Sequence, residues 1–359
     1  MLKQKGLSLI ELMIAITLGL ILLTGVMQVF LSSKNVFSSQ QALSRVQETG
    51  RLAIEFLSRD IRMAGYMGCA TRVAGMQVTN TLKSSANVMY DFTSAVNGYT
   101  NETFPIATLP ADTLTQTLTE DTDVLVVRSA AGSGAQISKN NDSAQVFITN
   151  VGSVEAGACS GGGDRISGVC EKDIVIVSDC EKSRIFQVSN VALGTGADAD
   201  KVNVVHSNAA MKPGNDYPSW GGATADASET FAPGAELLAA TNSIYFIANG
   251  VSGRPSLWQN INGLSMELLE GVDDISILYG VDADEDYVPN NYVDADVVSA
   301  ANNWPKVVAI RIELLVSSIE DNVLPEIQKY TFEGEEKTPD DRRLRQVFSA
   351  TVGIRSRLL

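Results

Sequence analysis

The sequence has little histidine and little positive charge, and each shortage narrows the range of functions. Its 359 residues include one histidine, His206, which argues against histidine-rich zinc sites and against histidine-based acid–base catalysis. Lys and Arg total 27 against 42 Asp and Glu, so the net charge of −15 gives no broad basic surface for nucleic acid. We find no polar catalytic cluster in the sequence, and we expect neither an enzyme nor a required cofactor.

The N-terminal 31 residues contain a long apolar run that almost lacks charge. Met1 to Gly6 is short and basic, and the 25 residues from Leu7 to Leu31 carry one charge, Glu11. About 20 apolar residues cross a bilayer as a helix, so this run is long enough to span, with its basic end in the cytoplasm. A secretory signal is cleaved after its apolar region, whereas the candidate cut here precedes it, after Gly6.

Proline is absent from Met1 to Asn101, which leaves the helix free to continue beyond the membrane. Apolar residues recur at helical spacing at Leu43, Val46, Ile54, Leu57 and Ile61. The pattern predicts one helix from Leu7 to about Ala64, about 85 Å long at about 1.5 Å per residue. Gly65 to Cys69 is a candidate C-terminal break, and Gly19, Gly25 and Gly50 are candidates for a bend or a close helix contact.

The remainder of the chain has the alternating pattern of strands. Three long runs carry it, at 275–281, 308–316 and 348–354, and shorter apolar runs at 124–127, 174–177, 185–188 and 244–247 are typical of buried strands. The expected fold class is α+β. The long N-terminal helix is expected to pack with its second half on an antiparallel sheet formed mainly by strands after Asp273.

The residues Lys5-Gly6-Leu7-Ser8-Leu9-Ile10-Glu11-Leu12 resemble the N-terminal signal of type IV prepilins and type II secretion pseudopilins. The resemblance implies that a prepilin peptidase cuts between Gly6 and Leu7 and that Leu7 is then N-methylated. Phe is the commonest residue at the first mature position, so Leu7 departs slightly from the pattern. The implied fold is pilin-like, with an enlarged strand-rich globular domain.

Glu11 is the residue of this motif whose role has a physical explanation. A carboxylate near the bilayer interior costs at least about 2.5–3.5 kcal/mol on insertion scales, so it persists only where a partner compensates. In pilins that partner is thought to be the N-terminal amine of a neighbouring subunit. The resemblance therefore implies that Glu11 is an assembly residue.

Further segments resemble PilW-type minor pilins of the type IV pilus. They are Gly65–Cys69, Ser178–Cys180, Ile185–Gln187, Leu269–Asp274, Tyr279–Asp282 and Arg342–Phe348. This family resemblance implies a minor pilin that helps to prime pilus assembly and lies at or near the tip. The alternative is a J-type minor pseudopilin of a type II secretion system, which is usually shorter.

The resemblance also implies domains, location and partners. We expect a leader at 1–6, a transmembrane helix at 7–31, its periplasmic continuation at 32–66 and a periplasmic strand-rich domain at 67–359. The expected location is the inner membrane before assembly and the pilus fibre afterwards. The expected partners are other minor pilins, the major pilin, a tip adhesin and the prepilin peptidase, with no nucleic acid.

Four cysteines are candidates for two disulfides in an oxidising periplasm. Cys159 and Cys170 flank a glycine-rich loop and could close it, which leaves Cys69, at the end of the helix, for Cys180 in a strand region. The alternative joins Cys170 to Cys180 and Cys69 to Cys159. No CxxC spacing occurs, which argues against a zinc or redox centre.

An acidic loop is a candidate calcium site. Asp282, Asp284 and Asp286 have the spacing of the first three ligands of an EF-hand loop, and Asn290 follows. Tyr287 stands where that motif needs glycine and Val293 where it needs glutamate. The alternative is a solvated acidic loop after a strand.

The other candidate residues have structural interpretations. We expect His206 to be a strand or loop residue, and Arg342, Arg343 and Arg345 to form ion pairs at the surface or to contact another subunit. The three tryptophans are expected in the core or at interfaces.

Overall fold

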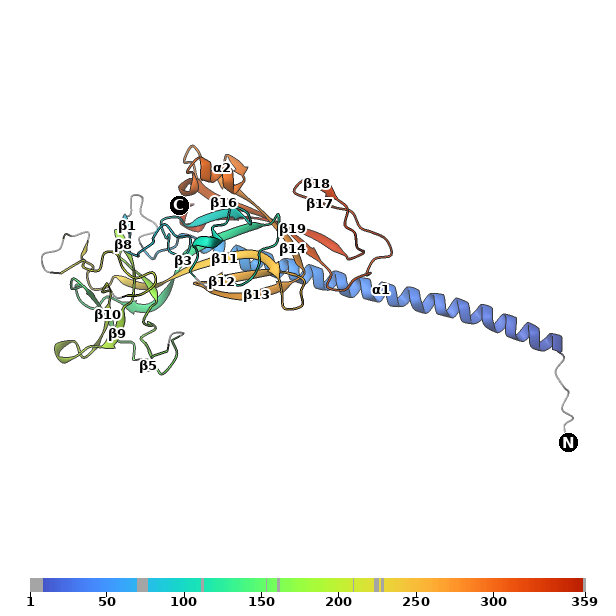
Figure 1. Cartoon of the computed structure of the whole chain (residues 1–359), viewed down its shortest axis with the longest axis horizontal. Coiled ribbons are helices and arrows are strands. Elements are labelled where there is room, and N and C mark those ends of the chain that lie inside the picture. Colours follow the sequence, from blue (N-terminus) through green and yellow to red (C-terminus); the bar gives the residue numbers. More distant parts are fainter. Residues whose placement is uncertain are drawn as a thin grey trace, which may run out of the picture.

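A computed structural model describes residues 9–69, 77–110, 113–152, 154–159, 162–208, 210–222, 226 and 229–357. One helix, α1 (Leu9–Met63), projects from a strand-rich head, and its N-terminal end lies far from the rest of the molecule (Figure 1). The expected α+β, pilin-like architecture is therefore confirmed. The helix ends at Met63, one residue before the predicted end, and the predicted start at Leu7 lies outside the described residues.

The sheet that supports α1 is formed by the C-terminal part of the chain, as expected. It has the order β15–β14–β16–β19 and is antiparallel throughout. Its strands are β14 (Val272–Val281), β15 (Asn291–Val293), β16 (Val307–Ser317) and β19 (Arg345–Gly353). The three long alternating runs of the sequence form β14, β16 and β19. A short helix, α2 (Ala295–Ala300), which the sequence analysis did not predict, follows β15.

A second sheet of eight strands forms the middle of the head, with β1, β8, β7, β11, β12 and β13 in that order. β3 pairs with the other edge of β11, and β2 pairs with β3. Only β1 and β8 run parallel among the described strands of this sheet. The strands are β1 (Gln77–Asn80), β2 (Val96–Thr100), β3 (Asp123–Gln136), β7 (Ile174–Ser178), β8 (Lys182–Gln187), β11 (Glu236–Asn249), β12 (Pro255–Ile261) and β13 (Leu264–Glu270).

β11 connects the two ends of the head. Its 14 residues pair with β3 along one edge, and along the other with β7 near Leu238 and with β12 near Phe246. Beyond β7 lies a distal lobe, which we define as residues 137–173 and 188–235. It holds the sheet β4–β10–β9 and the hairpin β5–β6, at the end of the molecule opposite the start of α1 (Figure 1). Its strands are β4 (Gln145–Thr149), β5 (Val154–Glu155), β6 (Arg165–Ile166), β9 (Asn190–Leu193) and β10 (Lys201–Val205).

The remaining elements are small. A hairpin of β17 (Tyr330–Phe332) and β18 (Glu335–Lys337) lies beside β19. Single 3₁₀ turns occur at Ile106–Thr108, Gly196–Asp198, Trp304–Lys306 and Arg355–Arg357.

The largest core lies where α1 and the two main sheets meet. Leu57 and Ile61 of α1 pack there with Tyr245 and Leu257 of the middle sheet and with Ile312 of the C-terminal sheet. The distal lobe has a separate core around Trp220 and Phe231. Two smaller clusters lie around Phe246 and around Leu238. The second half of α1 is anchored in the largest of these cores.

Candidate functional site

The first half of α1 has no tertiary support within the described chain. Its apolar side chains are exposed, with Leu22 at 71% and Ile21 at 68%. An 18-residue window of this helix has a mean hydropathy of 2.4, and none of it is buried in the head. A helix that is apolar on every side and long enough to span is suited to a lipid environment. The structure is therefore consistent with a membrane-anchored chain.

The threonine hydroxyls in this half of α1 form hydrogen bonds within the helix. Thr17 donates to the carbonyl oxygens of Met13 and Ile14 at 3.0 and 2.9 Å, and Thr24 donates to that of Leu20 at 2.8 Å. A hydroxyl bonded to the preceding turn needs no water, which makes it compatible with hydrocarbon. Glu11, in the first turn, forms no ion pair with any residue that the structure describes. The predicted cut between Gly6 and Leu7 lies outside the described residues.

The second half of α1 is docked on the C-terminal sheet. Its buried residues are Ala42, Val46, Gly50, Ala53, Leu57, Ser58 and Ile61. Gly50 is required by a close approach: a Cβ there would lie 2.3 Å from the ring of Phe348 on β19. Of the three glycines considered as contact points, only Gly50 has a neighbour this close, since a Cβ at Gly19 or Gly25 would meet nothing within 4 Å.

A polar cluster on α1 fixes the helix to the middle sheet. Asp60 accepts hydrogen bonds from the Tyr245 hydroxyl at 2.8 Å and from the Gln259 amide at 3.1 Å. Burial raises the pKa of Tyr245 above its usual range, so the hydroxyl remains a donor at neutral and alkaline pH. This cluster was not predictable from sequence, because Tyr245 lies 185 residues from Asp60 and nothing in the helical pattern distinguishes Asp60 from other surface charges.

The C-terminal end of α1 is tied to the head by backbone, side chain and disulfide. Gly65 adopts a φ of 71° after the helix, and its N–H donates to the Arg128 carbonyl at 2.8 Å. Ser356 donates to the Ala64 carbonyl at 2.6 Å. Cys69 is bonded to Cys180, 111 residues away, which links the segment after the helix to the middle sheet.

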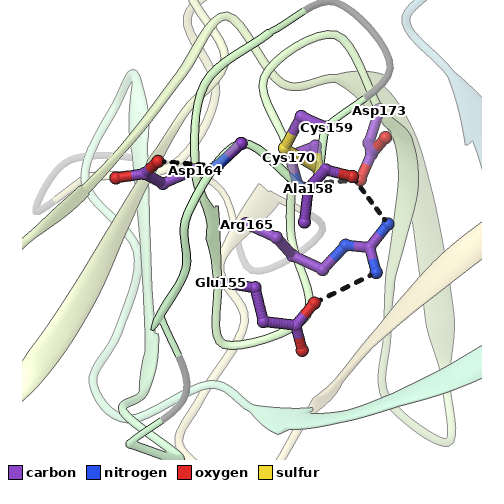
Figure 2. Close-up of a disulfide and its surroundings, with 8 residues drawn as sticks. Glu155, Ala158, Cys159, Asp164, Arg165, Cys170 and Asp173 are labelled. Atoms are coloured by element: carbon purple, nitrogen blue, oxygen red, sulfur yellow. Dashed lines mark hydrogen bonds and ion pairs between the residues drawn. A yellow bond between two sulfur atoms is a disulfide. The ribbon is translucent and has the colours of Figure 1, made fainter.

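A second disulfide closes the glycine-rich loop of the distal lobe. Cys159 is bonded to Cys170 with the two Cα atoms 5.7 Å apart. Figure 2 shows Arg165 between the carboxylate of Glu155 and the carbonyl of Ala158, with Asp173 beside the disulfide. Asp173 accepts the Cys170 N–H at 2.8 Å, and burial raises the pKa of Asp173. The loop is therefore held by both covalent and polar contacts.

The acidic loop between β14 and β15 brings three predicted ligands together. One carboxylate oxygen from each of Asp282, Asp284 and Asp286 lies within 4.8 Å of the others. Burial acts to raise the pKa of Asp282, but N–H donors from Tyr287 and Glu285 outweigh it and lower the pKa below its usual range. The predicted fourth ligand differs, because the Asn290 oxygen accepts the Ala283 N–H at 2.6 Å. Calcium binding stays a prediction.

The distal lobe buries His206 as part of its core. The ring stacks on Trp220 with the centroids 4.1 Å apart, and its Nδ1 lies 3.1 Å from the Pro218 carbonyl oxygen. Burial lowers the pKa of His206 to about 4, so the imidazole is neutral at physiological pH. This environment is typical of a structural histidine, in line with the sequence interpretation.

The basic cluster near β19 forms ion pairs within the head. Arg345 pairs with Asp341 and, at 3.5 Å, with Asp273, while Arg343 pairs with Asp321 at 2.6 Å. Arg342 donates to Asn322 at 2.7 Å. The ion pairs predicted for the three arginines are present for Arg343 and Arg345, but the Arg345 side chain is largely buried and does not lie at the surface.

Two comparisons with family models match the ends of the chain. A model described as the prokaryotic N-terminal methylation motif matches residues 1–27, and one described as type IV pilus-assembly protein W matches residues 244–356. The second match covers the last strands of the middle sheet and the whole sheet that carries α1. No curated protein and no solved structure matches the chain.

These family matches point to a structural component of the pilus that interacts with other pilins and is processed by a prepilin peptidase. They agree with the two features that dominate the structure, the unsupported apolar helix and the strand-rich head. Together, the two family matches and the structure support a PilW-type minor pilin of the type IV pilus.

Proposed function

We propose that this minor pilin helps to initiate pilus assembly and is incorporated at or near the pilus tip, without catalysing a reaction itself. The observation that carries the proposal is the position of the distal lobe, at the end of the head opposite the start of α1 (Figure 1). A subunit inside a fibre has neighbours on both sides along the axis, whereas the terminal subunit needs none beyond it. A lobe with its own core, placed at that end, suits the terminal position.

The proposed sequence of events follows from the two halves of α1. The first half holds the subunit in the inner membrane with the head in the periplasm, where disulfides persist. The prepilin peptidase cuts after Gly6, and Leu7 is N-methylated. On assembly the same apolar surface leaves the lipid and packs against the helices of other pilins, including the major pilin. An adhesin at the tip would then meet the distal lobe.

Glu11 sets the register of this packing in the proposal. It lies in the first turn of the described helix, and no described residue forms an ion pair with it. A neighbour's N-terminal amine at the same depth would compensate the buried carboxylate. The pairing thus favours one axial position of the subunit over its alternatives.

A Glu11→Ala variant tests the mechanism, with Thr17→Val as its control. Within the described part of the chain, the Thr17 hydroxyl bonds only to its own helix, so Thr17→Val should insert into the membrane and support surface pili as the parent does. Glu11→Ala should insert equally well but leave the cells without pili, as counted by electron microscopy. Normal piliation with Glu11→Ala would refute the pairing.

Deletion and processing experiments test the wider role. Deletion should abolish surface pili and twitching. Loss of exported enzymes with pili intact would instead favour the type II secretion alternative. Mass measurement of the N-terminal peptide should show loss of Met1–Gly6 and one methyl group on Leu7. Labelled heads along the whole fibre, rather than at its end, would refute the tip location.

A further inference from the structure

The strand β19 forms one edge of the sheet that carries α1, and its outward backbone groups can be identified. Two backbone hydrogen bonds at the ends of the β16–β19 pair set the pattern. The Ile354 N–H donates to the Val308 carbonyl at 2.9 Å, and the Ser318 N–H donates to the Leu344 carbonyl at 2.8 Å. Residues directly bonded across an antiparallel pair alternate with residues whose N–H and C=O point away. With the even-numbered residues bonded to β16, the odd-numbered residues of β19 present their backbone groups to the outside.

Arg345 is the first of these outward residues, and both of its outward backbone groups are already hydrogen-bonded to a side chain. The Gln328 side-chain amide donates to the Arg345 carbonyl at 3.0 Å and accepts the Arg345 N–H at 2.9 Å. No hydrogen bond from another described segment reaches the outward groups of Val347, Ser349 and Thr351. The edge is therefore open over three successive outward residues.

This edge lacks three of the protections that natural sheets use. Charges, proline and bulges normally prevent an edge strand from pairing with another chain. From Gln346 to Ile354 there is no charge and no proline, and the nine-residue pairing with β16 has no bulge. The edge strand β13 of the middle sheet differs, because it contains Glu267 and Glu270 and pairs through a register shift.

A groove runs beside the open edge, and α1 forms its other wall. It has a volume of about 630 Å³ and is lined from β19 by Gln346, Phe348 and Ser349. The α1 wall includes Glu48 and Arg51, exposed charges of opposite sign that form no ion pair within the described chain. An incoming strand would find backbone partners on one side and both signs of charge on the other.

We propose that an extended segment of a neighbouring, different pilin adds as a strand to the outer edge of β19 and fills this groove. The inference rests on the proposed function and extends it to the head. The proposal is supported by the position of the groove. One wall of the groove is α1, and the first half of the same helix is the surface that packs against other pilins in the proposed function. Backbone pairing supplies the contact, and the small side chains of Ser349 and Thr351 leave the edge accessible.

The directions of the elements exclude antiparallel pairing with the β19 strand of a second copy of this chain. Gly50 of α1 lies at Phe348, and Ala64 lies at Ser356, so α1 and β19 run in the same direction. Antiparallel pairing of two β19 strands reverses one subunit along the strand axis, and would point the two α1 helices in opposite directions. Two helices anchored from the same side of one membrane do not fit that arrangement.

Photo-cross-linking of the full-length protein in its native membrane tests the occupant. A photoreactive p-benzoylphenylalanine replaces Ser349 at the edge or, as the control, Val251, a 94% exposed residue on the β11–β12 turn. The expected result is a cross-link from position 349 to an extended segment of another pilin, identified by peptide mass, and none from position 251. Equal yields at the two positions, or cross-links only to a second copy, would overturn the proposal.

Backbone substitution tests the edge itself. Ser349→Pro removes one outward N–H, and Ser349→Ala changes the side chain alone. Loss of one net hydrogen bond predicts about two- to tenfold weaker recovery of the neighbouring pilin with Ser349→Pro and unchanged recovery with Ser349→Ala. If Ser349→Pro unfolds the head, Ser349→Lys replaces it, because that lysine would face Glu313 across the pair and adds a charge to the edge. Unchanged recovery with a folded Ser349→Pro or Ser349→Lys variant would refute the pairing.

The Glu11→Ala variant separates this inference from the proposed function. If Glu11→Ala blocks piliation while Ser349→Pro changes neither cross-linking nor recovery, only the edge pairing is wrong. If Glu11→Ala assembles normally, the helix mechanism is wrong whatever Ser349 shows.

Discussion

The two halves of α1 share one continuous backbone and differ in what surrounds them. Leu22 in the first half is 71% exposed, whereas Leu57 in the second half is fully buried. The first half is apolar on every side and carries one charge over its spanning segment, Glu11. The second half alternates an apolar stripe with Glu48, Arg51 and Glu55. The same secondary structure is thus built for two environments.

The difference between the two halves shows when a helix has an apolar stripe in its sequence. A stripe appears only where one face meets a protein core and the other meets water. The first half has no water-facing side in its working environment, so it has no stripe, and its order depends on lipid or on other helices. The second half is ordered by packing, by Asp60 and by the covalent link that follows the helix.

The largest expected effect comes from removing that link. In the chain-entropy treatment, a loop of 111 residues makes the Cys69–Cys180 bond worth about 4–5 kcal/mol, and one of 11 residues makes Cys159–Cys170 worth about 3 kcal/mol. The double variant Cys69→Ser/Cys180→Ser should therefore lose more unfolding free energy than Cys159→Ser/Cys170→Ser. Urea unfolding in detergent, followed by tryptophan fluorescence, measures both. Equal losses would show that loop length does not govern the stabilisation.

A matched pair of substitutions tests the two halves directly. Leu57→Ala should lower the unfolding free energy of the head by about 2–5 kcal/mol, because it leaves a cavity in the main core. Leu22→Ala should change the unfolding free energy by less than about 0.5 kcal/mol in detergent, because it contacts nothing in the head. A comparable loss in the two variants would mean that the first half also packs on the head.

The polar anchor of the docked half gives a smaller effect. Tyr245→Phe removes a hydrogen bond to the Asp60 carboxylate, which predicts a loss of about 1.5–3 kcal/mol in unfolding free energy. Tyr217→Phe is the control, since Tyr217 is 57% exposed. The same unfolding assay applies. If both variants match the parent, Asp60 is adequately solvated or held by Gln259 alone, and the anchor contributes nothing to docking.

The sequence correctly predicted those helices and strands that depend on residues close together in the chain. The apolar run from Leu7, the helix end before Gly65 and the three alternating runs depend on neighbours a few residues apart. Each could be read without knowing the fold, and each is present in the structure. The supporting sheet was placed correctly for the same reason, since its long strands lie together after Asp273.

Contacts between distant segments were not predictable in this way. Gly50 was recognised as a candidate close contact, but its partner Phe348 lies 298 residues later. The open edge of β19 follows from which strand lies beside which, and a single strand's sequence does not contain that information. The sheet of the distal lobe was also missed, because its strands are short and separated by long loops. The family resemblance supplied the role of Glu11, which periodicity cannot supply.

The smallest expected effect concerns the acidic loop, which lies on the sheet under the docked half of α1 and far from the first half. If the loop binds calcium with a Kd of about 1 mM, 10 mM calcium should raise the unfolding free energy of the head by about 1.4 kcal/mol. Chelation with EDTA should reverse the gain, and the variant Asp284→Asn/Asp286→Asn should not show it. Asp282 stays unchanged in that variant because its carboxylate also holds the loop backbone at Glu285 and Tyr287. A gain that persists in the double variant would place the calcium elsewhere, and no gain in the parent would leave the loop with its solvated interpretation.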